Sequence, residues 1–295
     1  MASYPPPPNP EILPPEAREY AREGPPSRQI PPQQSPPVTR PRRPWASSRA
    51  TYLLVGINCA VFLAMAFTHV NPFNPTYQQL LRWGADNAGA VLLDGQWQRI
   101  ITAMFVHVGI LHLATNMWCL WNLGLLAEPL LGSFGLIAVY VLTGAAGNLL
   151  STLVNWFQFR STITPDTFLF GPVGAGASGA VFGIAGALIV LLKSNRLPVP
   201  PNELKRLRNS VIYFAVINLV IGGSISFGTE VIGTGIHIDN MAHLGGVSCG
   251  LLMAVPMVPR IGSGRESFNL RMRAAIGMIV GLLVLFGFYL SKLPG

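Results

Sequence analysis

Charged residues are scarce in this chain of 295 residues. Asp, Glu, Lys and Arg make up only 11% of it, whereas a typical soluble domain carries about 25%. Half of the residues are hydrophobic, and the mean hydropathy is +0.43. This composition argues against an ordinary soluble globular protein and predicts a multi-pass integral membrane protein.

Cysteine is also rare. Cys59, Cys119 and Cys249 all lie in apolar segments, and three thiols cannot all pair with one another. Their spacing matches neither a disulfide framework nor a metal site, so we interpret them as small buried hydrophobic residues. No cofactor and no metal ion are expected.

The first 48 residues have few large aliphatic side chains. They hold 15 of the 26 prolines, a composition that cannot bury enough apolar surface to offset the entropy of ordering. They also lack the early basic stretch and apolar run of a secretory signal peptide. We therefore expect residues 1–48 to form a disordered, proline-rich cytoplasmic tail with polyproline II character.

Long apolar runs follow the tail. A helix crosses a bilayer with about 20 apolar residues, and we identify seven runs near that length. They lie at 51–68, 111–128, 134–155, 176–193, 209–227, 240–258 and 273–291. The predicted fold class is an all-α polytopic membrane protein.

Lys and Arg indicate the orientation, because they are enriched in cytoplasmic loops. With the N-terminus in the cytoplasm, all but four of the 20 basic residues fall on the inner side; the four are Arg82, Arg99, Arg160 and Lys292. Seven spans then put the C-terminus outside. The expected location is a bacterial cytoplasmic membrane, with an organellar membrane as the alternative.

The outer segment 69–110 mixes aromatic and charged residues, among them Trp83, Trp97, Asp86 and Arg99. Amphipathic sequence of this kind beside a span is typical of an element that lies in the membrane interface. We therefore expect more than a solvated loop between the first two runs.

Four polar side chains lie near the outer ends of predicted spans. His112 and Asn116 are near the start of the second run, Ser178 near that of the fourth and His243 near that of the sixth. These three runs all pass from outside to inside, so a rise of 1.5 Å per residue gives the four side chains a common depth of roughly 5–10 Å. Polar groups inside a membrane are functional candidates by default.

Together these residues could form a serine-nucleophile site. Ser178 starts its helix, where free N–H groups and the positive dipole end favour an oxyanion. A serine nucleophile needs a base within hydrogen-bond reach, and His243 is the candidate at matching depth. His112 and Asn116, four residues apart, share a helix face and could donate to the oxyanion.

Each motif alone also has a structural explanation. A small residue such as Ser178 beside glycines lets membrane helices pack closely. A lone histidine can be structural, and His-x-x-x-Asn can be an interhelical hydrogen-bond pair. The coincidence of all three at one depth favours catalysis. The pairs Gly179/Gly183 and Gly246/Gly250 would pack the fourth run on the sixth.

From about Gly95 to Pro259 the sequence resembles the rhomboid family of intramembrane serine proteases. The resemblance rests on GQWQRIITAMFVHVGILHLATN, on the Glu128-x-x-x-Gly132 turn, on GASGAVFG and on DNMAHLGG. Arg99 matches the arginine of the family's Trp-Arg motif, although Gln98 replaces the tryptophan. The resemblance implies a six-helix protease core over 49–259, with 260–295 as a linker and an added seventh transmembrane helix.

The resemblance also implies a role for each candidate residue. Ser178 would be the nucleophile and His243 the base, acting as a dyad, and His112 and Asn116 would stabilise the oxyanion. An aromatic residue four positions after the serine would pack on the histidine. The supporting residues would be Phe182, Gly176 and Gly179.

Asp239 lies four residues before His243, and two roles are open for it. It could be a third catalytic residue, or it could cap the sixth helix. Its place at the outer interface favours the cap, because a carboxylate stays hydrated there and is costly to move into a lower dielectric.

The sequence therefore predicts an intramembrane serine endopeptidase that cleaves transmembrane segments of membrane proteins. The expected partners are transmembrane protein substrates and the lipid bilayer, and no nucleic acid. Two alternatives are a catalytically silent relative that binds membrane proteins and a transporter. A transporter would show interrupted helices near the bilayer centre, whereas the polar residues here lie near one face.

Overall fold

The computed structural model describes residues 48–160, 172–193, 200–232, 239–258 and 264–293, apart from the side chains of 159 and 221–232. The chain divides into two units, residues 1–42 and 43–295, and the description below concerns the second. The predicted tail, residues 1–48, lies outside the described residues except for Ser48.

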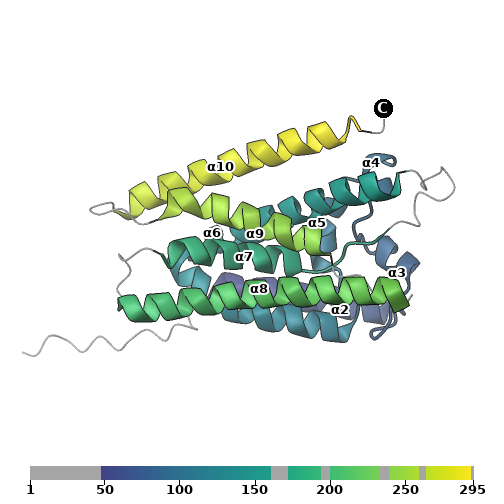
Figure 1. The fold of residues 1–295 in the computed structure, drawn as a ribbon, viewed down its shortest axis with the longest axis horizontal. Helices are drawn as coiled ribbons and strands as arrows, with labels where there is room; N and C mark the ends of the chain where they lie inside the picture. Colours follow the sequence, from purple (N-terminus) through teal and green to yellow (C-terminus); the bar gives the residue numbers. More distant parts are fainter. Residues whose placement is uncertain (1–47, 161–171, 194–199, 233–238, 259–263, 294–295) are drawn as a thin grey trace, which may run out of the picture. The chain divides into compact units, whose positions relative to one another are not determined.

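Helices dominate the described part of residues 43–295 (Figure 1). The long ones are α2 (Arg49–Phe67), α6 (Ile110–Phe159), α7 (Ser178–Leu191), α8 (Pro201–Ile232), α9 (Asn240–Ala254) and α10 (Arg265–Leu290). Three of them, α2, α6 and α10, are long and apolar enough to cross a membrane. The predicted all-α membrane fold is confirmed.

Helix α6 contains two of the predicted runs. Its backbone breaks at Gly132, where φ 75° and ψ 164° are not helical. A positive φ is open to glycine at little steric cost, so the chain can end one helix and start the next at this residue. The predicted turn at Glu128-x-x-x-Gly132 is therefore present.

Two helices begin earlier than the apolar runs predict. Helix α8 starts at Pro201 rather than 209, and α10 starts at Arg265 rather than 273. Both have a polar first section, which a search for apolar residues leaves out. Proline suits the first helical position of α8, because that position needs no N–H donor.

Helices α6, α7 and α9 pack together, with α10 along α6 and α8 along α7 (Figure 1). Glycine allows α7 and α9 to touch through their backbones. A methyl group on Gly246 would collide with the carbonyl of Gly179, and one on Gly250 with the carbonyl of Gly183. The predicted packing of the fourth run on the sixth is confirmed.

Glu128 joins α2 to α6. Its buried carboxylate accepts hydrogen bonds from the backbone N–H groups of Ala50 and Thr51, both at 2.9 Å, and from the Thr51 hydroxyl at 2.8 Å. The Ser133 hydroxyl donates a fourth bond at 2.6 Å. The carboxylate thus satisfies free N–H groups at the start of α2 and complements its dipole.

The outer segment between α2 and α6 is folded. It contains α3 (Tyr77–Arg82), α4 (Ala88–Leu92), α5 (Arg99–Thr102) and the short 3₁₀ helix η3 (Ala103–Phe105). Side chains of α4 and α5 pack on the second half of α6 and on the end of α10, in a cluster with Leu149, Trp156 and Leu290. The structure holds no membrane, so an interfacial position of this segment stays a prediction.

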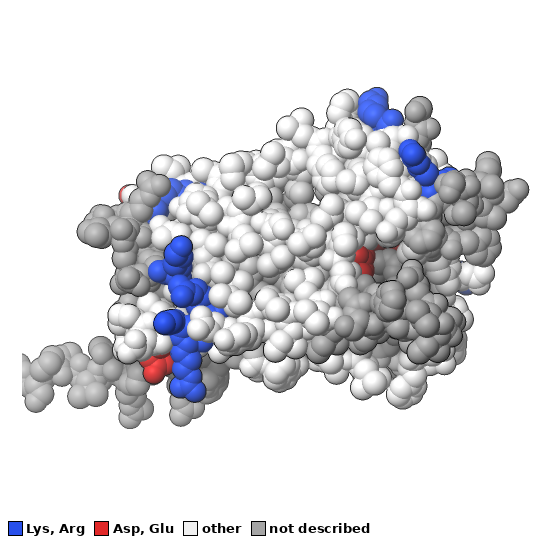
Figure 2. Space-filling model, in the orientation of Figure 1, with Lys and Arg blue, Asp and Glu red and all other residues white. Residues whose placement is uncertain are grey.

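Charge is unevenly distributed over the surface. In the face shown in Figure 2, most of the described Lys and Arg side chains lie towards the two ends, and a broad uncharged surface separates them. The exposed apolar side chains of the described residues include Trp118, Val220 and Val284. A belt of this kind suits a protein surrounded by lipid.

Candidate active site

Ser178 is the first residue of α7 and is half-buried. Gly176, two residues earlier, has a φ of +130°, a value that side chains of L-residues rarely adopt. Among the residues that the structure describes, no side chain caps the N-terminus of α7. The first N–H groups of the helix are thus available to an anion next to the serine hydroxyl.

His243 lies in the first turn of α9, and only 6% of its surface is exposed. Its ring stacks on Phe182, with the ring centres 4.3 Å apart and the planes 16° apart. Phe182 follows Ser178 by one helical turn, so the two share a face of α7. The structure places Phe182 on His243 as the resemblance implies.

The backbones beside Ser178 and His243 are also in contact. A methyl group on Gly179 would lie 3.2 Å from the carbonyl oxygen of Ala242. Gly179 follows the serine and Ala242 precedes the histidine. The first turns of α7 and α9, which carry the two candidate residues, therefore meet directly.

The His112 ring packs against Gly176, two residues before Ser178. A methyl group on Gly176 would be only 2.6 Å from Cε1 of the His112 ring, so a larger residue than glycine would displace the ring. The Val108 N–H donates to Nδ1 of His112 at 3.4 Å. In the neutral ring this leaves the proton on Nε2, which is then a hydrogen-bond donor.

Asn116 is buried on the same face of α6 as His112. Its side-chain nitrogen donates to the carbonyl oxygen of His112 at 2.9 Å. A side-chain amide has two N–H donors, so this bond uses one of them. The structure thus brings Ser178, His243 and His112 around Gly176 and Gly179, with Asn116 one turn along α6 from His112.

Asp239 is the N-cap of α9. One of its carboxylate oxygens accepts from the N–H of Ala242 at 2.9 Å, and the other accepts from the Ser151 hydroxyl. Nδ1 of His243 has no hydrogen-bond partner among the described residues. Of the two roles left open by the sequence, the structure shows the cap.

His107 is part of the site and was not predicted from the sequence. It is fully buried, and its ring centre lies 5.3 Å from that of His112. Nδ1 is 3.3 Å from the carbonyl oxygen of Phe105, and the N–H of Ala177 donates to Nε2 at 3.5 Å. His107 thus holds the residue before Ser178.

Burial is the main reason why the pKa of His107 is lowered to about 3, and the neighbouring His112 adds to the effect. The ring is neutral at physiological pH, so Nε2 can accept the Ala177 bond while Nδ1 donates to Phe105. The one sequence feature that could have pointed to His107 is its position five residues before His112. His107 precedes the apolar run at 111–128, and a polar residue outside such a run does not stand out.

Arg99 organises the outer segment beside the site. Its guanidinium donates to the carbonyl oxygens of Leu81 and Ala85 at 2.7 and 2.8 Å, and to the side-chain oxygen of Gln96 at 2.7 Å. Trp97 instead lines an apolar groove of about 540 Å³ formed with α6 and α10. Arg99 therefore makes these three hydrogen bonds although residue 98 is glutamine and not tryptophan.

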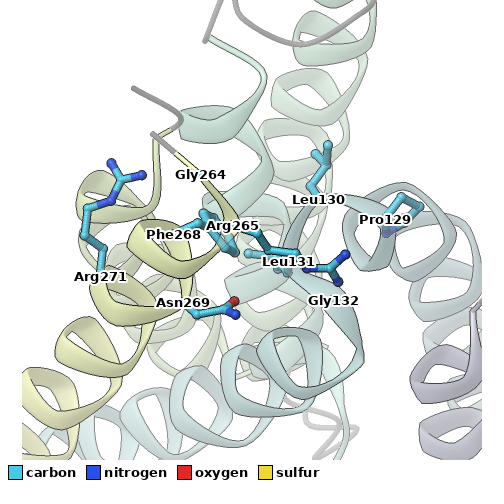
Figure 3. A pocket seen from close by; sticks show the side chains of 9 residues that line it. All are labelled: Pro129, Leu130, Leu131, Gly132, Gly264, Arg265, Phe268, Asn269 and Arg271. Carbon is cyan, nitrogen blue, oxygen red and sulfur yellow. The ribbon is translucent and has the colours of Figure 1, made fainter. Parts of the chain in front are cut away.

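Figure 3 shows a second pocket, which has a volume of about 290 Å³. It is formed by the break in α6 at 129–132 and by the first turns of α10, including Arg265 and Asn269. Gly132 is 20 residues along α6 from His112, which corresponds to roughly 30 Å. None of the candidate site residues lines this pocket.

The described side chains of the site include the groups that a nucleophilic centre uses. Within the described ranges, no group of three or more His, Cys, Asp or Glu residues is arranged to hold a metal ion. The side chains provide a hydroxyl, a neutral imidazole base and several N–H donors.

Comparison with known proteins points to a single family. The family model described as Rhomboid domain matches residues 94–260. The chain is 29% identical over 241 residues to the rhomboid protease GluP of Bacillus subtilis, an alignment that covers 81% of this chain and 40% of that protein. It is also 29% identical over 213 residues to the rhomboid protease AarA of Providencia stuartii, covering 70% and 72%.

A plant relative is similar to the same degree. RHOMBOID-like protein 6, mitochondrial, of Arabidopsis thaliana is 30% identical over 200 residues, which cover 68% of this chain and 56% of that protein. The matched part thus spans less than half of GluP and about half of the plant protein.

Proposed function

The chain belongs to the rhomboid family, and from this premise we propose that it is an intramembrane serine endopeptidase with Ser178 and His243 as its catalytic dyad. The observation that carries the proposal is the meeting of α7 and α9 at their first turns, where His243 stacks on Phe182. This contact brings the histidine to the helix that starts with the serine.

In the proposed reaction, His243 takes the proton of the Ser178 hydroxyl while Oγ attacks the carbonyl carbon of the scissile peptide bond. The tetrahedral intermediate collapses when His243 gives that proton to the leaving amine. A water molecule then loses a proton to His243 and attacks the carbonyl carbon of the acyl-enzyme. When this second tetrahedral intermediate collapses, His243 returns the proton to Oγ of Ser178, which releases the second product and regenerates the serine.

We assign the stabilisation of the oxyanion to several donors. They are the N–H groups at the open N-terminus of α7, the Nε2–H of His112 and the second amide N–H of Asn116. Donors fixed before the reaction stabilise developing charge without a cost of reorganisation. The Phe182 ring would orient the imidazole of His243, because the Asp239 carboxylate binds the Ala242 N–H and the Ser151 hydroxyl and not that ring.

The proposed substrates are transmembrane segments of other membrane proteins. Their peptide bonds would be cleaved near the outer face of the bilayer, since the dyad lies at the predicted outer ends of α7 and α9. On the basis of the Lys and Arg distribution, we propose that the N-terminus lies in the cytoplasm and the C-terminus outside. The proposed location is a bacterial cytoplasmic membrane.

A fluorophosphonate probe tests the dyad directly, because it forms a covalent adduct only with an activated serine. The purified protein in detergent should be labelled at Ser178 and should cleave a single-span reporter. Ser178→Ala and His243→Ala should each abolish both activities, and the double variant should be no worse than either. Ser210→Ala, which changes an exposed serine of α8, is the matched control and should be labelled normally.

The alternative of a catalytically silent membrane-protein binder predicts the opposite result. In that case the folded wild-type protein would show no adduct and no reporter cleavage, although it would still retain the reporter on affinity capture. Labelling of Ser178→Ala at the wild-type rate would show that another residue is the nucleophile.

A further inference from the structure

Two carboxylates, the buried Asp86 and the half-buried Asp239, lie near the segments that carry the candidate dyad and are not part of it. Asp86 is in the outer segment and has 2% of its surface exposed. Asp239 caps α9. Gly174 lies between them: a methyl group there would be 3.3 Å from Oδ2 of Asp239 and 3.7 Å from Oδ2 of Asp86.

Both carboxylates bind neighbouring hydroxyls of α6. The Thr152 hydroxyl donates to Asp86 at 3.0 Å, and the Ser151 hydroxyl donates to Asp239. Ser151 and Thr152 are almost completely buried, with 1% and 0% exposed surface. The Asn155 side chain adds a bond to the Ser151 hydroxyl at 3.1 Å, so this turn of α6 is a fixed polar anchor.

Each carboxylate ties one part of the candidate site to this anchor. Asp86 pairs through its backbone with Gly174, by an N–H···O bond of 2.8 Å in one direction and 2.9 Å in the other. Gly174 is four residues before Ser178. Asp239 fixes the N-terminus of α9, and its own carbonyl accepts the N–H of His243 at 3.2 Å.

We propose that Asp86 and Asp239 are a pair of positioning residues, which hold Ser178 and His243 in register by fastening the two segments that carry them to Ser151 and Thr152. The proposal rests on the dyad proposed above. Neither carboxylate touches the reacting atoms in this scheme; each acts through the backbone that it holds.

This arrangement explains three features of the structure that have no role in the dyad itself. Two acidic side chains, one buried and one half-buried, lie close together, which is costly unless they are bound. Adjacent hydroxyls of α6 face both of them. Position 174 is a glycine, and any larger side chain would press against Oδ2 of Asp239 and the Cβ of Asp86, which lie 3.3 and 3.4 Å from the methyl position.

The test compares Asp86→Ala and Asp239→Ala with their Asn counterparts in the full-length protein. A misplacement on the order of 1 Å can cost about 100-fold in rate. We therefore expect each Ala variant to lower kcat and the rate of fluorophosphonate labelling by about 100-fold, with KM nearly unchanged. The Asn variants, which keep a hydrogen-bonding side chain and a competent cap, should remain within about tenfold of wild type.

The double Ala variant separates a shared role from two independent ones. Residues that act as a unit are not additive, so the double variant should lose about 100-fold rather than about 10,000-fold. Asp94→Ala is the control, because Asp94 is an exposed carboxylate of the same outer segment. Its labelling rate should equal that of wild type.

Three results would overturn the proposal: wild-type labelling rates in both folded Ala variants, losses that multiply in the double variant, or a loss confined to KM. If the Ala variants do not fold, Ser151→Ala and Thr152→Val give the same test by removing the hydroxyl anchors, and unchanged kcat in both would contradict the proposal. Absence of any label on wild-type Ser178 would instead refute the dyad itself.

Discussion

Asn116 shows how one residue can serve both the helix and the reaction. Its amide already donates to the His112 carbonyl in its own helix, and the second N–H is the one proposed for the oxyanion. Two other kinds of donor, His112 and the start of α7, share that task. Asn116 should therefore matter less than Ser178 or His243.

We expect Asn116→Ala to reduce kcat by about 100-fold or less, the low end of the range for loss of an oxyanion donor. KM for a single-span reporter should change little, because the donor acts mainly in the transition state. Steady-state cleavage with a parallel thermal melt checks this. Complete inactivation of a folded Asn116→Ala protein would mean that the residue has another role.

At the residue scale, the sequence makes some site residues visible and hides others. Ser178, His243, His112 and Asn116 are polar residues in apolar runs, where their energetic cost draws attention to them. His107 and Asp86 lie in segments of mixed composition, where a polar residue carries no cost until the fold buries it. Their importance follows only from contacts with Ala177 and Gly174, distant in sequence.

At the scale of helices, the site depends on how closely α7 and α9 approach. Gly246 faces the carbonyl of Gly179 so closely that a methyl group has no room. Because the obstacle is backbone, it cannot move aside as a flexible side chain would. The two first turns, and with them Ser178 and His243, would have to separate.

Gly246→Ala should consequently abolish cleavage and destabilise the protein by about 1–3 kcal/mol, the usual cost of overpacking. Gly277→Ala in α10 is the matched control, because no atom of the described part of the chain lies within 4 Å of the added methyl group. Labelling of Ser178 and the thermal midpoint should both be measured. A fully active Gly246→Ala protein would contradict the backbone contact between α7 and α9.

The existence of the long helices was predictable from apolar runs, but their limits were not. The polar first turns of α8 and α10 carry no hydrophobic signal, and α3, α4 and α5 are too short to show a helical period. The break in α6 was predictable as a turn, since Gly132 follows Glu128 and Pro129 at the end of an apolar run.

For the molecule as a whole, Asp86 links stability to pH. Burial raises its pKa from 3.8 to about 7, and the charge of Asp239 adds to the rise, whereas the Thr152 bond and the charge of Arg99 oppose it. Between pH 4 and 7 the folded protein therefore keeps a proton that the unfolded chain has lost. By linkage, stability falls as the pH rises through this window and levels off above it.

A pKa difference of this size corresponds to a loss on the order of 4 kcal/mol across the window. Asp86→Asn cannot ionise, so its stability relative to wild type should increase steadily from pH 4 to 7 and then stay constant. Thermal unfolding in detergent at several pH values measures this difference, in which the other titrating groups largely cancel. A pH-independent difference for Asp86→Asn would show that the buried carboxyl does not hold its proton.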